Sequence, residues 1–460
     1  MTPVTTRYTR LTLTTLLAVG VFLFWYVGYP QALNFQEQFQ LFLWTDDYFW
    51  QRLGTPGGLA DWLGEFLVQF YYIKWLGALL LALLFAALQR ASWLVLHALL
   101  GKSRMSNTIG YGLSFALPLA LLWLMGDENV LASLPIAMLL TLIAVALMQR
   151  LHRWWWLLIV PLLYWSIGMQ WSTYYRIPST WPRLDGYERD RYELIWQDYA
   201  TRSEKWDDVL ARASNYEVRT AFWSNCVNLA LAQKRQLADR QFDFYQSGPN
   251  ALLMEPHRDM MSNLPTAEAY WRLGFVNEAE RYMTEIQEAT LNGKKSVRCT
   301  RRIAECHIVN GQYALAAKLL RQLSHTLFYS QWAEETLKLI SDEAAVKAHP
   351  LYGHLRQLRL QDEQLFSYSH IEQMLGQLIT INPSNLMALD YFMGQLLLTG
   401  NLEGFQHYLG WVEQHGGYRR MPLGYQDVMY SLQHNEASDS PYLQYIRQQQ
   451  KEIATHEKNH

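Results

Sequence analysis

The chain has 460 residues, a formal net charge of −2 at pH 7 and three cysteines. This length allows two or three domains. A net charge so close to zero gives no basic field for nucleic acid, so we expect no nucleic-acid partner. Cys226, Cys299 and Cys306 form no Cys-x-x-Cys pair and no Cys/His cluster with zinc spacing. We therefore predict buried thiols, with no metal site and no cofactor.

The charged residues divide the chain into two parts. Residues 1–170 contain 9 Lys/Arg and 7 Asp/Glu, whereas residues 171–460 contain 30 and 34. The first part has the composition of a membrane domain, and the second that of an ordinary soluble domain. We predict a transmembrane domain at 1–176, a Pro/Gly-rich linker at 177–186 and a soluble domain at 187–460.

Five apolar segments lie in the first part, at residues 11–28, 72–89, 107–125, 131–148 and 154–171. Each has nearly the length needed to cross a hydrocarbon core of about 30 Å. The first is followed by no small-residue cleavage site, so we interpret it as a retained helix. The segment "QRASWLVLHALLGK", 89–102, is too short for a further crossing and predicts an amphipathic stretch on the cytoplasmic surface.

The charges between these segments predict an orientation. With a cytoplasmic N-terminus and five crossings, seven basic residues fall inside: Arg7, Arg10, Arg90, Lys102, Arg104, Arg150 and Arg153. Seven acidic residues fall outside: Glu37, Asp46, Asp47, Asp61, Glu65, Asp127 and Glu128. The positive-inside rule favours this arrangement. It predicts a multi-pass protein of the bacterial inner membrane with residues 187–460 in the periplasm.

Residues 29–71 form an outer loop rich in aromatic side chains. The run "TPGG", 55–58, divides it into two short helices. Such segments lie in the membrane interface or between the membrane helices, and the sequence leaves both open. Asp46 and Asp47 follow Thr45, and the simplest interpretation is that they cap a helix that begins at Tyr48.

A catalytic interpretation of Asp46 and Asp47 is the alternative. The run "TDDYF" is similar to the paired acidic residues in the first outer loop of polytopic glycosyltransferases that use polyprenyl-phosphate donors. That resemblance implies Asp46 as the base for an acceptor hydroxyl and Asp47 as the contact to a metal ion or phosphate. Ion or lipid-headgroup binding is a third possibility.

The second part shows a helical repeat pattern. Three passages, 267–286, 304–323 and 393–412, each predict a helix that ends at a glycine, a short turn and another helix. The glycines are Gly274, Gly311 and Gly400, and "INPSN", 381–385, supplies a turn between units. This resembles a degenerate tetratricopeptide repeat, which implies stacked helix pairs with a groove for a protein partner. The stretch 229–250 predicts one long helix that runs into a Gly-Pro turn.

Four blocks carry a further resemblance, and they cover the length of the chain. They are "FQEQFQLFLWTDDYFWQRLGTPGGLADWLGEFLVQFYY", "NLALAQKRQLADRQFDFYQSGP", "RLGFVNEAERY" and "INPSNLMALDYFMGQLLLTGNLEGF". In this order they resemble an uncharacterised family of multi-pass inner-membrane proteins from Bacteroidota, classed as a domain of unknown function. The resemblance implies the inner membrane as location and a periplasmic repeat domain.

Together these patterns predict an all-α protein with two possible functions. The first is a non-enzymatic scaffold in envelope assembly or transport, in which about five helices contact the lipid bilayer and the repeat groove binds a protein. The alternative is a glycosyltransferase-like membrane enzyme that uses Asp46 and Asp47.

Overall fold

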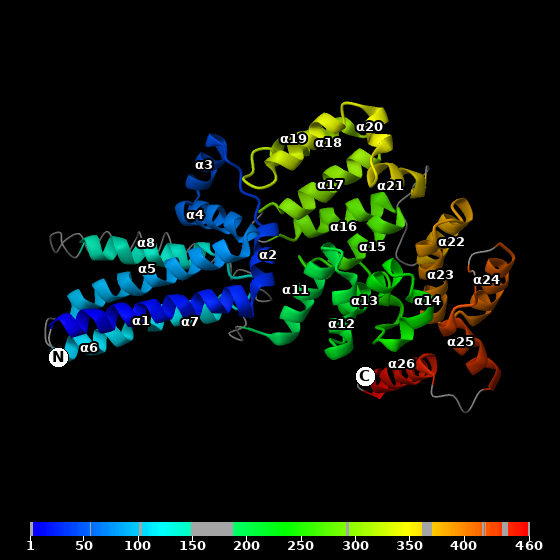
Figure 1. Ribbon diagram of the computed structural model, residues 1–460, viewed down its shortest axis with the longest axis horizontal. Coiled ribbons are helices and arrows are strands. Elements are labelled where there is room, and N and C mark those ends of the chain that lie inside the picture. Colours follow the sequence, from blue (N-terminus) through cyan, green and yellow to red (C-terminus); the bar gives the residue numbers. More distant parts are fainter. Residues whose placement is uncertain are drawn as a thin grey trace. The chain divides into compact units, whose positions relative to one another are not determined.

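The computed structural model describes residues 3–55, 57–100, 104–148, 187–290, 294–360, 370–415, 418, 420–434 and 440–458. Within these ranges the chain consists of helices and their connections and contains no strand (Figure 1). The prediction of an all-α chain is therefore confirmed for the described residues. The expected fifth apolar segment, 154–171, and the expected linker, 177–186, lie outside them.

The chain folds into two compact units that do not follow its linear order. The first unit contains Met1–Ile195 together with Thr290–Thr300 and Leu320–Glu335. The second contains Trp196–Ala289, Arg301–Leu319 and Thr336–His460. Two segments from the part of the chain that we expected to be soluble thus fold with the apolar first part.

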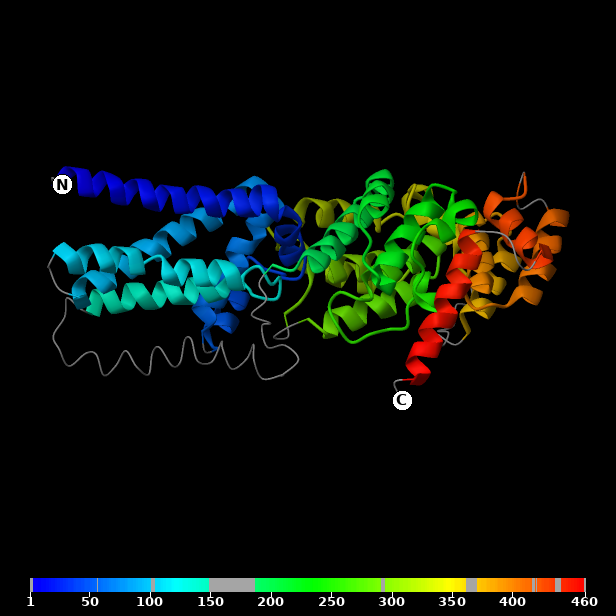
Figure 2. The same cartoon turned by 90° about the horizontal axis from the view of Figure 1, so that it is seen from below.

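In the first unit, α5 is the central helix. It contacts α1, α6, α7 and α8 (Figures 1 and 2). The elements of this unit are α1 (Pro3–Leu23), a π-helical turn (Phe24–Gly28), α2 (Pro30–Gln38), α3 (Asp46–Leu53), α4 (Gly58–Gln69), a 3₁₀ turn (Phe70–Tyr72), α5 (Lys74–Leu100), α6 (Arg104–Leu113), α7 (Ala116–Leu124) and α8 (Ser133–Met148).

Three helical stretches are long and apolar enough to cross a membrane: Arg7–Gly28, Lys74–Leu100 and Asn107–Leu124. They correspond to three of the five expected segments. The fourth is the shorter apolar helix Ser133–Met148. The expectation of a separate amphipathic stretch at 89–102 was wrong, because residues 89–100 continue α5 without a break. At 27 residues α5 is roughly 40 Å long.

A buried polar network joins α1, α5 and α6. The Thr14 hydroxyl donates to Gln89 Oε1 at 2.8 Å, and it also lies 2.9 Å from the Tyr111 hydroxyl. Gln89 Nε2 donates to Ser114 Oγ at 2.8 Å. In an apolar bundle such hydrogen bonds fix the rotation of one helix against the next.

The outer loop is partly buried and partly exposed. Ala32, Leu33 and Phe35 of α2 belong to the core, whereas Trp44 is 63% and Trp50 is 67% exposed. The loop therefore has an inner face packed on the bundle and an outer face rich in indole rings.

Two segments of the unit that lie far along the chain complete the packing of this loop. The backbone N–H of Leu41 donates to Lys295 O at 2.7 Å, and that of Trp44 donates to His325 O at 2.8 Å. Ser296 Oγ donates to Gln38 O at 2.8 Å. Residues 39–44 lie outside the helices, so these bonds satisfy backbone groups there that would otherwise lack partners.

The second unit is built from helices joined mostly by short turns. Its elements include α12 (Trp206–Asn215), α13 (Ala221–Gln233), α14 (Leu237–Arg240), a 3₁₀ turn η6 (Gln241–Asp243), η7 (Gly248–Ala251), α15 (Leu264–Leu273), α16 (Val276–Glu288), α20 (Glu343–Ala348), α21 (Tyr352–Leu358), α22 (Ile371–Ile381), α23 (Leu386–Leu398), α24 (Leu402–His415), α25 (Leu423–His434) and α26 (Pro441–Lys458). Four helices, α11 (Arg189–Arg202), α17 (Val297–Val309), α18 (Tyr313–Leu323) and α19 (Ser330–Leu339), contribute residues to both units.

The glycines that the sequence singled out do end helices. Gly274, Gly311 and Gly400 have φ of 96°, 73° and 71°. Each stands between two helices, as expected, and the turn at 381–385 separates α22 from α23. A left-handed residue after the last helical turn is the usual way to satisfy its carbonyls, and glycine adopts it without steric cost.

Two further sequence predictions have clear outcomes. The long helix expected at 229–250 was wrong, because α13 ends at Gln233 and Arg235 takes a φ of 57°. The chain then forms the short elements α14 and η6. The prediction of buried thiols is confirmed, since Cys226, Cys299 and Cys306 are free and buried.

We expect Gly274→Ala to destabilise the protein much more than Gly311→Ala. Both substitutions force a left-handed backbone on alanine, at a cost of about 1 kcal/mol. At Gly274 the new Cβ would also lie 2.9 Å from Leu358 Cβ, whereas nothing lies within 4 Å at Gly311. Overpacking of this kind adds about 1–3 kcal/mol. Thermal unfolding of the purified chain in detergent measures the difference, and equal midpoints would contradict the close packing at Gly274.

Candidate functional site

The structure places Asp46 and Asp47 in the first turn of α3, where both side chains are exposed. The capping side chain is Thr45, whose hydroxyl accepts from the Tyr48 N–H at 3.3 Å. We expected Asp46 or Asp47 to cap a helix that begins at Tyr48. The helix instead begins at Asp46, and its cap is Thr45, one or two residues earlier. The aspartates stabilise this helix through their position beside its positive end.

A buried ionic centre lies on the inner side of the same loop. The Glu65 side chain, on α4, is 1% exposed. Its Oε1 lies 3.0 Å from Arg52 Nη2 and 3.1 Å from Lys294 Nζ, and its Oε2 accepts from the Tyr48 hydroxyl at 2.5 Å. The carboxyl of Asp61 lies 3.9 Å from Lys294 Nζ. The positive charges of Arg52 and Lys294 therefore balance the negative charges of Glu65 and Asp61.

The environment of Glu65 indicates a structural role. Burial raises the pKa of Tyr48, and the negative charge of Glu65 raises it further, so the phenol keeps its proton. Burial alone would lower the pKa of Arg52, but the Glu65 carboxylate outweighs it and the net shift is upward. Removing ions from water costs several kcal/mol each, by order of magnitude, and is offset only by such close pairing. The Glu65 carboxylate thus holds Arg52 and Lys294 in place, which is a structural role.

A second buried carboxylate in the first unit is Glu128, in the loop between α7 and α8. It pairs with Nε of Arg191, and its side chain is 2% exposed. Burial raises the pKa of Glu128 to about 7, with Arg191 opposing the shift and Asp127 adding to it. Glu37 is also buried, and both of its carboxylate oxygens accept from the Tyr329 hydroxyl, at 2.9 and 3.0 Å.

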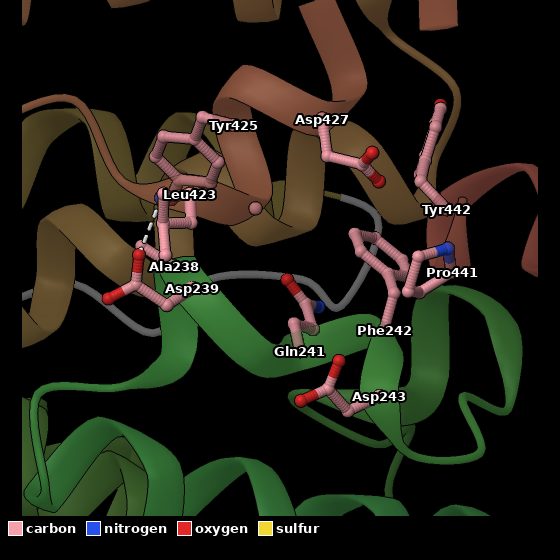
Figure 3. Close-up of a pocket in the computed structure, with 11 residues that line it drawn as sticks. Ala238, Asp239, Gln241, Phe242, Asp243, Leu423, Tyr425, Asp427, Pro441 and Tyr442 are labelled. Carbon is pink, nitrogen blue, oxygen red and sulfur yellow. Dashed lines mark hydrogen bonds between the residues drawn. The ribbon is translucent and has the colours of Figure 1, made fainter. Parts of the chain in front are cut away.

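The second unit contains a pocket of about 190 Å³ that is lined from four short stretches of chain. These are α14, η6, the start of α25 and the start of α26 (Figure 3). We call it the α14–α25 pocket. Its walls combine aromatic rings with three carboxylates, those of Asp239, Asp243 and Asp427. Sequence reasoning missed it, because the stretch 229–250 was interpreted as one long helix, with no break before Asp239.

The three carboxylates differ in how they are held. Asp239 Oδ1 accepts from the backbone N–H of Leu423 at 2.6 Å, the dashed line in Figure 3. Asp243 Oδ2 pairs with Arg240 Nε at 3.1 Å. Among the residues that the structure describes, nothing pairs with the half-buried carboxylate of Asp427. Asp427 is thus available for a ligand.

The aromatic side of the pocket is fixed by neighbouring buried groups. The Tyr425 hydroxyl lies 3.4 Å from that of Tyr418, which donates to Asp390 Oδ1 at 2.7 Å. Burial raises the pKa of Asp390 to about 6, and the bond from Tyr418 opposes this. The ring of Phe242 packs edge-on against Tyr442, with centroids 5.0 Å apart. The pocket walls are therefore ordered without a ligand.

Groups of three or more His, Cys, Asp or Glu that could hold a metal ion are absent from the described ranges. This applies to Asp46 and Asp47 as well as to the α14–α25 pocket. Neither arrangement has the ligand set of a metal centre in those residues.

Comparison with known proteins identifies a family. A family of unknown function, DUF6057, matches residues 6–177 and 169–456, so the chain belongs to it. No curated protein and no solved structure matches. The family carries no assigned activity, so a function has to be inferred from the side chains.

We expect Glu65→Gln to destabilise the first unit strongly. The substitution keeps the size of the side chain but leaves Arg52 and Lys294 without their shared counter-charge, and breaking a buried pair costs about 3–5 kcal/mol. The matched control is Asp46→Asn with Asp47→Asn, which removes exposed charges from a helix start and costs less than about 1 kcal/mol each. A thermal midpoint for Glu65→Gln equal to that of wild type would show that the centre contributes nothing to folding.

We expect the stability of the protein to rise as the pH falls from about 8 to about 6, by about 1 kcal/mol from Glu128 alone. The folded-state pKa of about 7 lies above the ordinary 4.5, so the folded protein binds a proton that the unfolded chain has released. This contribution is full below the ordinary pKa and is lost as the pH rises through the folded value. Glu128→Gln should flatten this part of the profile in denaturation measurements, and an unchanged profile would rule out the effect.

Proposed function

We propose that this member of the DUF6057 family is a multi-pass protein of the bacterial inner membrane that holds a protein-docking unit in the periplasm. One combination of features carries the proposal. Three helical stretches have the length and apolar character of membrane spans, and the same chain contains a separate helical unit with an ordered, open pocket. The proposed source is a bacterium of the Bacteroidota, on the resemblance of the sequence blocks.

The distribution of charge supports the orientation. Arg7 and Arg10 lie at the start of the first span, and Lys102 and Arg104 lie between the second and third, whereas Asp127 and Glu128 follow the third. An excess of basic residues marks the cytoplasmic side of membrane proteins. The outer loop and the second unit then lie in the periplasm, as the positive-inside rule predicts for five crossings.

The helix–glycine–helix pairs support docking as the activity. The pairs α15/α16 and α23/α24 each enclose a glycine turn, and α17/α18 repeats the pattern. Tetratricopeptide-like stacks of such pairs use their open surface to bind proteins and carry no reactive groups of their own. We propose that the second unit works in this way, as a scaffold in envelope assembly or transport.

The alternative function is a polyprenyl-phosphate-dependent glycosyltransferase activity at Asp46 and Asp47. One observation favours it: both carboxylates are exposed next to the exposed indoles of Trp44 and Trp50. Indole rings seek the membrane interface, where a lipid-linked donor would present its phosphate. Asp46 would serve as the base, and Asp47 as the contact to a metal ion or phosphate.

We expect native mass spectrometry of the full-length protein, extracted gently from its own membranes, to show a stoichiometric protein partner. The full chain is needed, because deletion of residues 187–460 would also remove 290–300 and 320–335, which belong to the first unit. Asp46→Asn with Asp47→Asn should leave the partner bound. A bound polyprenyl phosphate that disappears in this double variant would instead favour the glycosyltransferase. A chain that is free of protein partners in several mild detergents would contradict docking.

A further inference from the structure

We propose that the α14–α25 pocket binds the side chain of a lysine or arginine, presented by an exposed segment of the protein that docks on the second unit. This inference rests on the proposed docking function and names the chemistry of its partner. Four features of the pocket support it: its charge, its aromatic wall, an amide without a partner, and its size.

The charge of the pocket favours a cation. Asp239, Asp243 and Asp427 all line it, and Arg240 neutralises one of them through its pair with Asp243. Figure 3 shows Asp427 on the opposite side of Phe242 and Gln241 from Asp243. A cation beside Asp427 would give that carboxylate the counter-charge that it lacks among the described residues, and charge-assisted hydrogen bonds of this kind are the strong ones.

The aromatic wall favours a cation with a long apolar stem. Phe242, Tyr425 and Tyr442 line the pocket, and Ala238 and Pro441 extend the apolar surface. Lysine and arginine place their methylene stems on such surfaces while the charged end reaches polar groups. A ring within about 6 Å of the charge adds a cation–π contribution. A bare metal ion would leave this wall without a partner.

The Gln241 amide indicates that the ligand also has a hydrogen-bond acceptor. Gln241 is 3% exposed, and its Nε2 has no hydrogen-bond partner among the described residues. Its amide lies at the centre of the lining residues in Figure 3. Gly394 leaves room for it, because a Cβ there would come 2.7 Å from Gln241 Oε1. Buried amide donors are nearly always paired, so the carbonyl oxygen of a bound peptide is a suitable acceptor.

The size of the pocket agrees with a single side chain. Its volume of about 190 Å³ is smaller than the roughly 300–1,000 Å³ of cofactor and small-molecule sites. A nucleotide or a lipid-linked sugar would not fit. One lysine or arginine residue of a peptide supplies both groups: its backbone carbonyl is the hydrogen-bond acceptor, and its long side chain carries the positive charge.

The test uses full-length protein in lipid nanodiscs and two small probes, N-acetyl-lysine-N-methylamide and its norleucine analogue. The probes share the acetyl and amide groups and the apolar stem, and only the first is charged. We expect ligand-observed NMR titrations to give at least about tenfold tighter binding of the lysine probe, the gain of one charge-assisted contact of about 1.4 kcal/mol. Asp427→Asn should remove most of this gain and leave the norleucine probe unaffected.

The matched control is Asp342→Asn, at an exposed helix cap of the second unit where asparagine caps equally well. It should change neither titration. Gln241→Met should weaken both probes, because both carry the carbonyl acceptor. Thermal midpoints show that each variant is folded. Equal affinity for the two probes, or lysine binding that survives Asp427→Asn, would overturn the assignment, as would saturable Ca²⁺ binding at Asp427 without any lysine binding.

The outcome separates this inference from the docking proposal. If a partner remains bound to the Asp427→Asn protein in native mass spectrometry and the lysine probe does not bind the wild type, docking stands and the pocket assignment fails. If the lysine probe binds as expected and no partner is found, the pocket binds basic residues but the docking proposal fails.

Discussion

The contact between Glu65 and Lys294 connects the first outer loop to a segment that the chain reaches only after much of the second unit. Lys294 Nζ lies 3.1 Å from Glu65 Oε1, and both side chains are almost completely buried, so this pair ties the two segments together within the first unit. Arg52 and Tyr48 complete the centre from α3, so the turn between α3 and α4 is held from both sides. Backbone bonds from Leu41 and Trp44 to Lys295 and His325 then follow from this placement. Without Glu65, Arg52 and Lys294 would lose the carboxylate that they share.

Local patterns in the sequence predicted the helical class, the ends of the helices at Gly274, Gly311 and Gly400, and three of the span-length stretches. These features depend on neighbours in the chain: hydrophobic length, or the left-handed conformation that glycine adopts easily. The continuation of α5 through residue 100 was missed, because Arg90 and Ser92 interrupt the apolar run without interrupting the helix. The ionic centre could not be predicted, because nothing near Glu65 in the sequence indicates Lys294 as its partner.

The aspartates illustrate the same limit at the candidate sites. Asp46 and Asp47 attract attention as an adjacent pair, yet adjacency on a helix start points both side chains to solvent. Asp427 has no such signal, since it stands alone in the sequence between Gln426 and Val428. Its carboxylate becomes part of a site only because α25 packs on α14, where Asp239 accepts from the Leu423 N–H at 2.6 Å. A helix break at Arg235, which the apolar pattern of 229–250 did not show, makes that packing possible.

Glu65 in the first unit and Asp427 in the second are held in opposite ways, which supports a structural role for Glu65 and a binding role for Asp427. In the first unit, Glu65 is surrounded by cations at hydrogen-bond distance and excluded from solvent, so a ligand would have to displace existing partners at a cost of several kcal/mol, by order of magnitude. In the second unit, Asp427 keeps solvent access and has no cation among the described residues, while Gln241 Nε2 is buried without an acceptor. A ligand that supplies both a cation and an acceptor would pair with both of these groups. Binding is therefore favoured where the fold leaves its polar groups unsatisfied, and the α14–α25 pocket meets that condition.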